Sequence, residues 1–257
     1  MPDTKDIAVK RILLAVSSIH DLTPISTAIT LAEQLQAQLE TLFVEDINLL
    51  HLAELPFAQE LDSISGELRP VTLSLMEQSL QAEVHRIRNT LVSTSQGKRV
   101  QWNLSVVRGN YFSEAMNVSN VDILFMPGSK RVSMAKKKAC PTDKPRYKSQ
   151  PIFVYFNGNQ ESQRALVLAN KVALSMNIEL IVLLPEWTDS LVATANTLIG
   201  ANNRVRFEVS ANDIQSINNT VKSSGCSLLM MPRTIVSDQP STYLVSDSFE
   251  CPLVLVT

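Results

Sequence analysis

Short, continuously apolar segments alternate along the chain with longer segments whose apolar residues recur every three or four positions. The clearest apolar segment covers residues 151–156; it ends in an Asn-Gly-Asn turn and is followed by a helical pattern from about Gln160. A second segment, residues 11–16, is also followed by a helical pattern. Such segments are typical of strands buried on both faces of a parallel sheet. We therefore predict an α/β fold in which strands and helices alternate.

This order of elements occurs twice. The segments that predict strands are residues 11–16, 39–44, 100–107 and 122–128 in the first half, and 151–156, 178–184, 204–209 and 226–231 in the second. A fifth strand, residues 252–256, has no counterpart in the first half. We predict two domains, residues 1–149 and 150–257, each Rossmann-like with a mainly parallel sheet. We expect the first sheet to have four strands and to lean on the second domain, in which residues 151–156 form a central strand.

One strongly basic segment separates the two halves. Residues 129–149 contain eight Lys or Arg residues against the single acid Asp143. One interpretation is a loop that binds phosphate or another anion, and a related one is a contact for an acidic protein or for membrane headgroups. The other interpretation, which we prefer, is an irregular, solvated linker, because the segment has a single aromatic residue, Tyr147, and no Gly-rich phosphate loop.

Composition narrows the functional classes. The 257 residues carry a formal net charge of −2, which does not favour nucleic acid as a partner. The three cysteines and three histidines show no metal-ligand spacing, so no metal is expected. Ser17 and Ser18 lie near His20, but no Gly-x-Ser-x-Gly turn surrounds them, and no catalytic residue is predicted. With neither a signal-peptide pattern nor an apolar run of membrane-spanning length, we expect a cytoplasmic protein with no membrane span.

Several motifs carry a family resemblance. They are Leu42-Phe43-Val44-Glu45-Asp46, Leu52-Ala53-Glu54-Leu55-Pro56-Phe57-Ala58, the strand at 122–128 that ends in Met126-Pro127-Gly128-Ser129, and Ile152-Phe153-Val154-Tyr155-Phe156-Asn157-Gly158. Together with the order of elements, they resemble two universal stress protein domains in tandem. The resemblance implies adenine nucleotide alpha hydrolase-like domains packed as a pseudo-dimer, and in one branch of the family it implies ATP or AMP binding. A homodimer of the whole chain is a further state that we consider.

The nucleotide-binding branch of this family has an Asp after the first strand and a Gly-rich loop after the fourth. Here Ser17 and Asn157 stand at the Asp position in the two halves. After the fourth strand the first half has Gly128 and Ser129 with Arg131 at the next Gly position, and the second half has no glycine there. Backbone amides can surround a phosphate only where side chains leave room. We therefore expect degenerate nucleotide sites and no obligatory cofactor.

Three functions remain open at this point, the third being a partner-binding scaffold that acts through the basic segment 130–148. The first is a non-enzymatic stress-response binding or regulatory module. The second is binding of ATP, AMP or another small anion by the first half alone, at the carboxyl ends of its strands. The resemblance implies that this site would comprise Ser17, Ser18, Val44, Gly109, Pro127, Gly128, Ser129, Lys130 and Arg131. The corresponding degenerate positions in the second half are Asn157, Leu184, Pro232 and Arg233.

Overall fold

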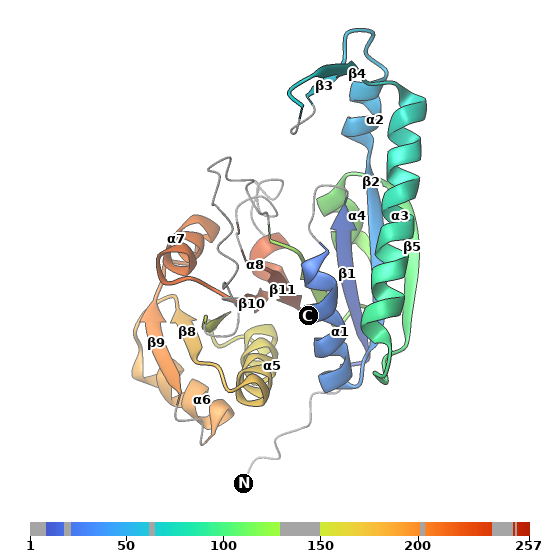
Figure 1. Ribbon diagram of the computed structural model, residues 1–257. Coiled ribbons are helices and arrows are strands. Elements are labelled where there is room, and N and C mark those ends of the chain that lie inside the picture. Colours follow the sequence, from blue (N-terminus) through green and yellow to red (C-terminus); the bar gives the residue numbers. More distant parts are fainter. Residues whose placement is uncertain are drawn as a thin grey trace.

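The protein is described from a computed structural model that covers residues 9–17, 22–61, 65–128, 150–200, 204–237, 249 and 251–257 (Figure 1). In chain order the strands are β1 (Arg11–Ser17), β2 (Gln38–Asp46), β3 (Gln59–Leu61), β4 (Leu68–Pro70), β5 (Trp102–Gly109), β6 (Ile123–Met126), β7 (Ile152–Tyr155), β8 (Leu180–Leu184), β9 (Val205–Val209), β10 (Leu228–Pro232) and β11 (Leu253–Val256). The helices are α1 (Thr23–Leu35), α2 (Ile47–Ala53), α3 (Leu73–Ser95), α4 (Tyr111–Asn117), α5 (Gln160–Met176), α6 (Asp189–Ile199), α7 (Ile214–Ser224) and α8 (Arg233–Ser237).

One nine-stranded sheet runs through both halves in the order β5-β2-β1-β6-β11-β10-β7-β8-β9. The first half contributes β5-β2-β1-β6, and the second half repeats this order in mirror image as β10-β7-β8-β9. The neighbours within each half pair in parallel. The predicted repeat, the α/β fold and the central position of residues 151–156 are therefore confirmed. The described part of the first half contributes four strands to this sheet.

The last strand, β11, joins the two halves. It pairs in parallel with β10, with Leu255 opposite Met231, and antiparallel with β6, with Leu255 opposite Leu124. We expected two sheets in contact, but the structure has a single continuous sheet. The reason is that a four-stranded first half leaves the β6 edge unpaired, and β11 supplies the missing backbone partners. The basic segment 129–149, whose irregularity we predicted, lies outside the described residues.

Helices cover both faces of the sheet (Figure 1). Residues of α1, α3, α5 and α6 pack on one face, and residues of α4, α7 and α8 pack on the other. Each of the two resulting cores contains residues from both halves of the chain. The central strands β7, β8, β10 and β11 are buried at every position, whereas the outermost strands β5 and β9 consist of exposed and half-buried residues. This difference follows from their places in the sheet, because only the outermost strands border solvent.

Polar side chains fix where several helices begin. Asp46 caps α2 by accepting a hydrogen bond from the Asn48 N–H at 2.9 Å. Thr72, Asn110, Asn159 and Asp213 cap α3, α4, α5 and α7 in the same way. Each cap satisfies a backbone N–H that has no partner within its helix. Segment 56–70, for which the sequence indicates no regular element, contains the hairpin β3–β4.

The cap of α7 makes stability sensitive to acid. Hydrogen bonds from the side chain and backbone of Ser216 hold the pKa of Asp213 below its ordinary value of 3.8. The carboxylate therefore stabilises the folded protein above pH 4, and this contribution is lost as the pH falls below that value. We expect Asp213→Ala to lower the free energy of unfolding by about 1 kcal/mol at pH 7 and by less at pH 3. Urea unfolding at both pH values measures this, and an equal loss at both would contradict it.

Candidate functional site

The carboxyl ends of the first-half strands bring five of the predicted site residues to one edge of the sheet. Ser17 and Val44 are direct partners across β1 and β2, and Gly109 is opposite Asp46 across β2 and β5. Pro127 and Gly128 follow β6, which lies beside β1. Ser17, Val44 and Pro127 are buried. The other four predicted residues, Ser18, Ser129, Lys130 and Arg131, lie outside the described part of the chain.

Helix α4 occupies space at this edge. Its first residue, Tyr111, is buried and donates a hydrogen bond from its hydroxyl to the Ala15 carbonyl in β1, at 3.0 Å. A Cβ atom placed on Gly109 would come within 2.5 Å of Oε1 of Glu114. The Glu114 side chain of the same protein therefore fills the space beside Gly109. The sequence analysis missed Tyr111 and Glu114, although the capping residue Asn110 places Tyr111 at the start of a helix.

The described charges at this edge include several carboxylates. Glu45 lies at the end of β2 and accepts a hydrogen bond from Arg108 Nε at 3.1 Å. Arg108 also lies 3.7 Å from Glu77 of α3. Asp46 uses its carboxylate for the α2 cap, and Glu114 packs against Gly109. An anionic ligand would meet these carboxylates, which would weaken its binding.

In the second half, the corresponding edge begins with a turn held by amides. Asn157 Oδ1 accepts a hydrogen bond from the Asn159 N–H at 3.2 Å, and Asn159 Oδ1 accepts one from the Ser162 N–H at 2.7 Å. Gly158 between them has φ +85°, a conformation that side chains other than glycine's rarely adopt. Leu184 is fully buried, and its carbonyl accepts a hydrogen bond from Ser210 N–H at 2.8 Å. These polar groups thus form hydrogen bonds to other groups of the protein itself.

Pro232 and Arg233 come directly before and at the start of α8. The Arg233 guanidinium donates to the Met116 carbonyl at the end of α4, so this side chain links the second half to the first. Burial lowers the pKa of Arg233, and the nearby carboxylate of Glu161 partly offsets that effect. Glu161 Oε2 also accepts hydrogen bonds from the N–H and the hydroxyl of Thr234, at 3.2 and 2.8 Å. The segment that follows β10 is thereby tied to helices of both halves.

Buried polar groups gather on the α7 side of the second half. The Tyr155 hydroxyl donates to Asn212 Oδ1 at 2.9 Å, and burial raises the pKa of Tyr155 to about 12. Ser210 Oγ and Asn218 Oδ1 are buried, and neither has a hydrogen-bond partner within the described part of the protein. Tyr155 therefore stays neutral at physiological pH, which suits a structural hydrogen bond.

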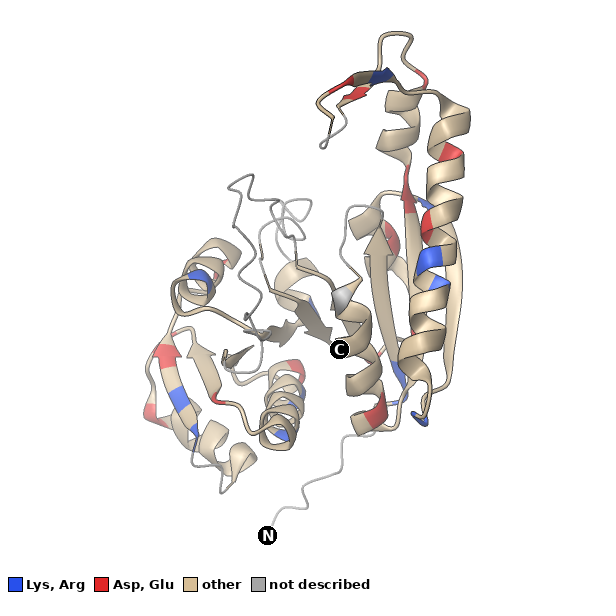
Figure 2. Cartoon of the chain, in the orientation of Figure 1, with Lys and Arg blue, Asp and Glu red and all other residues tan. Residues whose placement is uncertain are grey.

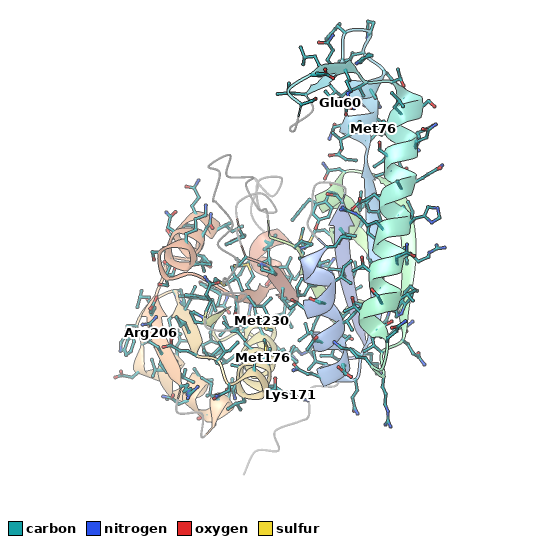
Figure 3. The ribbon with its side chains drawn as sticks, in the orientation of Figure 1. Glu60, Met76, Lys171, Met176, Arg206 and Met230 are labelled. Carbon is teal, nitrogen blue, oxygen red and sulfur yellow. The ribbon has the colours of Figure 1, made fainter. Side chains whose placement is uncertain are left out.

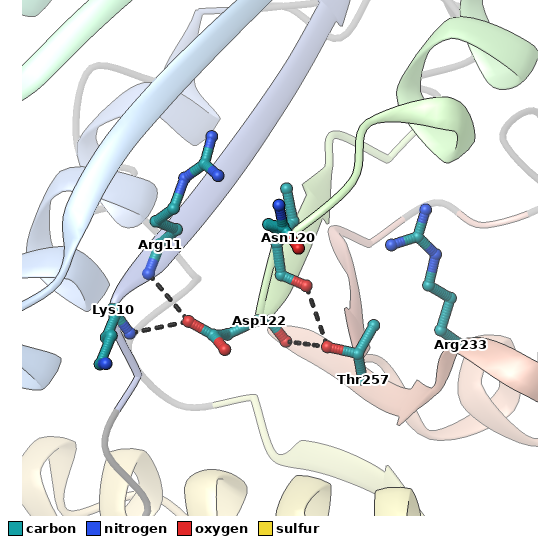
Figure 4. Close-up of a pocket in the computed structure, with 7 residues that line it drawn as sticks. Lys10, Arg11, Asn120, Asp122, Arg233 and Thr257 are labelled. Carbon is teal, nitrogen blue, oxygen red and sulfur yellow. Dashed lines mark hydrogen bonds between the residues drawn. The ribbon is translucent and has the colours of Figure 1, made fainter.

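A cavity of about 440 Å³ lies where the two halves meet (Figure 4). Its lining comes from both halves and consists of Lys10, Arg11, Asn120, Val121, Asp122, Arg233 and Thr257. Asp122 Oδ2 accepts hydrogen bonds from the backbone N–H groups of Lys10 and Arg11, at 2.8 and 2.9 Å. The Thr257 hydroxyl donates to the Val121 carbonyl at 2.9 Å. The sequence did not indicate this cavity, because β11 and β6 are more than a hundred residues apart.

The described residues include no cluster of His, Cys, Asp and Glu side chains that could hold a metal ion. Cys226 and Cys251 are free and buried, two residues before the neighbouring strands β10 and β11. Burial raises the pKa of the Cys226 thiol, and a hydrogen bond with Cys251 raises it further. A protonated thiol is a poor nucleophile, so Cys226 is best explained as a packing residue. No described helix is long and apolar enough to cross a membrane.

Comparison with known proteins identifies the fold. A universal stress protein from Archaeoglobus fulgidus DSM 4304 superposes with a TM-score of 0.54 and 10% sequence identity, over 96% of each chain. A universal stress protein in complex with cAMP matches 42% of this chain and 96% of its own, at 19% identity and a TM-score of 0.33. A functionally unknown protein from Pseudomonas aeruginosa PAO1 matches 97% of this chain and 92% of its own, at 11% identity and a TM-score of 0.42.

No protein-family model matches the sequence, and no curated protein matches it. The first superposition extends over nearly the full length of both chains, so it includes both halves. The chain therefore matches the fold of a universal stress protein over 96% of its length. At 10% identity this likeness defines the fold, and function has to be argued from the site itself.

Proposed function

We propose that this protein is a universal stress protein with two domains, residues 1–149 and 150–257, that acts as a non-enzymatic binding or regulatory module in a stress response. The full-length fold match and the motifs in both halves support the family. We infer that the protein does not require a nucleotide because, in each half, side chains of the protein itself occupy the edge of the sheet where a ligand would bind. Glu114 packs against Gly109 in the first half, and Arg233 reaches Met116 from the second.

The electrostatics of the two edges support the same proposal. Nucleotide phosphates bind where backbone amides or cationic side chains converge. At the first edge, Glu45 and Asp46 stand beside Arg108, whose guanidinium is already engaged by Glu45. At the second edge, Glu161 binds the backbone N–H of Thr234 near the start of α8. That amide is thus not free for a phosphate.

Titration with nucleotides tests this proposal. We expect isothermal titration calorimetry of the full chain with ATP, ADP or AMP at millimolar concentration to give no saturable heat. We also expect no release of phosphate from ATP above the buffer rate. Saturable heat with any of these nucleotides would contradict the absence of nucleotide binding. Turnover of ATP that is lost in Ser129→Ala would contradict the non-enzymatic assignment.

A second candidate function is binding of ATP, AMP or another small anion by the first half alone. It is favoured by the convergence of Ser17, Gly109 and Gly128 at one edge of the sheet. Under this alternative, calorimetry gives a saturable heat that Gly128→Val abolishes, because the added side chain would block close approach of a phosphate. Pro232→Ala, in the second half beside Arg233, which corresponds to Gly128, is the control and would leave the heat unchanged.

A further inference from the structure

Strand β9 forms an outer edge of the nine-stranded sheet, on the outside of the second half (Figure 1). Among the described strands it pairs only with β8. An outer strand presents a row of N–H and C=O groups that can accept a further strand. Proline and lysine, which commonly prevent such pairing, are absent from Val205–Val209. The backbone of β9 is therefore able to pair with another extended chain.

The directions of the peptide groups show which residues of β9 are available for pairing. The Arg204 carbonyl accepts a hydrogen bond from an N–H of β8 at 3.0 Å, and the Ser210 N–H donates to a carbonyl of β8 at 2.8 Å. Since the direction reverses at each residue of a strand, the even-numbered residues of β9 also face β8. The N–H and C=O groups of Val205, Phe207 and Val209 therefore point away from the sheet.

The side chains of β9 divide between two faces. Arg206 and Glu208 lie on one face, with Arg206 Nη2 at 3.1 Å from Glu208 Oε1, and Figure 2 shows these opposite charges along the strand. Phe207 lies on the other face, where Trp187 stands edge-to-face with it. Trp187 and Val209 are 57% and 53% exposed. The outer side of β9 thus has one charged face and one apolar face.

An antiparallel copy of β9 matches this arrangement. When two β9 strands pair with Phe207 opposite Phe207, Arg206 of each copy lies opposite Glu208 of the other. Val205 of each copy then lies opposite Val209 of the other, and the outward peptide groups of both strands face each other. The two charged pairs occupy positions without backbone hydrogen bonds, where opposite side chains are closest. Unlike charges in such positions stabilise strand pairing.

Charge also selects the strand and its register. Within the five residues of β9, a pairing centred on Arg206 or on Glu208 would place a residue opposite another of the same charge. Like charges directly opposite each other destabilise strand pairing. The other outermost strand, β5, carries Arg108 as its only charged residue and offers no complementary pair. The sequence that complements β9 is therefore its own.

We propose that β9 pairs with β9 of a second copy of this chain, antiparallel and centred on Phe207, so that two nine-stranded sheets join in a homodimer. The pairing supplies backbone partners for the outward peptide groups and replaces the Arg206–Glu208 contact within one strand by two contacts between chains. Five paired residues per copy bury less than the roughly 1,200 Å² of a stable complex. We therefore expect a weak dimer, with a dissociation constant on the order of 100 μM.

Charge reversal tests the register. Arg206→Glu places carboxylates opposite each other and Glu208→Arg places guanidinium groups opposite each other, so each variant alone should dimerise roughly 10-fold more weakly than the wild type. A mixture of the two variants can form a mixed dimer with unlike charges at both positions. Sedimentation equilibrium of the full chain from about 10 μM to about 1 mM, with fluorescently labelled R206E in the mixture, measures this association.

The mixture separates contact between chains from contact within one chain. Neither variant has unlike charges at positions 206 and 208 of its own strand, so a pair within the strand cannot explain a recovery. The mixed dimer should form with about the dissociation constant of the wild type. Lys171→Glu is the matched control, because Lys171 is exposed on α5, and Figure 3 labels it apart from Arg206. It should leave the dimer unchanged.

Val209→Pro tests the backbone contact separately. The substitution removes an N–H that points away from the sheet, so the pairing of β9 with β8 is retained. The hydrogen bonds between the two copies are lost, and the dissociation constant should rise roughly 10-fold or more. Circular dichroism checks that each variant remains folded.

Three results would overturn the proposal. The first is a wild-type chain that stays monomeric at about 1 mM, a concentration well above the expected dissociation constant. The second is a single charge reversal that dimerises as tightly as the wild type. The third is a mixture of R206E and E208R that associates no better than either variant alone.

Discussion

Replacing Leu255 by Ala is expected to destabilise both halves of the protein together, by about 2–5 kcal/mol in the free energy of unfolding. Leu255 is fully buried in β11, opposite Leu124 of the first half and Met231 of the second. The cavity left by the lost methyl groups would therefore weaken the packing of both halves at once. Because the sheet and its two cores are continuous across β11, we expect one cooperative unfolding transition.

The two tryptophans make this measurable, since each half contains one. Trp102 begins β5 and donates to Ser95 Oγ at 3.1 Å, and Trp187 stands edge-to-face with Phe207 at a ring distance of 6.5 Å. Urea unfolding is followed by fluorescence in Trp102→Phe and Trp187→Phe backgrounds. Leu255→Ala should shift both midpoints equally. A shift confined to the Trp187 signal would show that the halves unfold independently.

Val209→Ala is the matched control for this experiment. Val209 ends the outermost strand β9 and is 53% exposed. Loss of its methyl groups leaves no buried cavity, so the free energy of unfolding should change by less than about 0.5 kcal/mol.

Replacing Asp122 by Ala is expected to lower the free energy of unfolding by about 2 kcal/mol. Its carboxylate accepts two backbone hydrogen bonds at the start of β1, from Lys10 and Arg11. Hydrogen bonds to a charged group contribute more than neutral ones, although partial exposure reduces the effect here. Asp122→Asn keeps one acceptor oxygen and should retain part of the stability. Urea unfolding at pH 7 measures both variants.

The matched control for Asp122 is Glu186→Ala. Glu186 is an exposed acid in the second half, and its removal should change the free energy of unfolding by less than about 0.5 kcal/mol. A loss below 0.5 kcal/mol for Asp122→Ala would mean that water replaces the carboxylate without cost. The start of β1 would then be held by strand pairing alone.

The fold could be predicted in large part from local patterns. Buried strands are readable as apolar runs, and the repetition of the pattern indicated two similar halves. The edge strand β5 was readable too, because its alternation reflects one exposed face. The hairpin β3–β4 was missed, since its three-residue strands are too short for a periodic signal and its two leucines remain exposed.

The candidate site could be predicted only in outline. Ser17, Val44 and Gly109 were expected at one edge, and parallel pairing brings them there. Their neighbours could not be predicted in the same way. Glu114 approaches Gly109 through the path of α4, and Arg233 reaches Met116 across 117 residues of sequence. Such contacts depend on how separate elements pack, which local periodicity does not encode.

The sequence by itself determined the alternation of strands and helices and the duplication of the pattern in the two halves. These features follow from hydrophobic periodicity and turn residues, which act over a few positions. Only the tertiary structure decided that β11 would pair antiparallel with β6 and join the halves into one sheet. It also decided that Leu61 and Leu68 of the hairpin β3–β4 would remain exposed. Both outcomes depend on which backbone and apolar groups remain without partners once the local elements have formed.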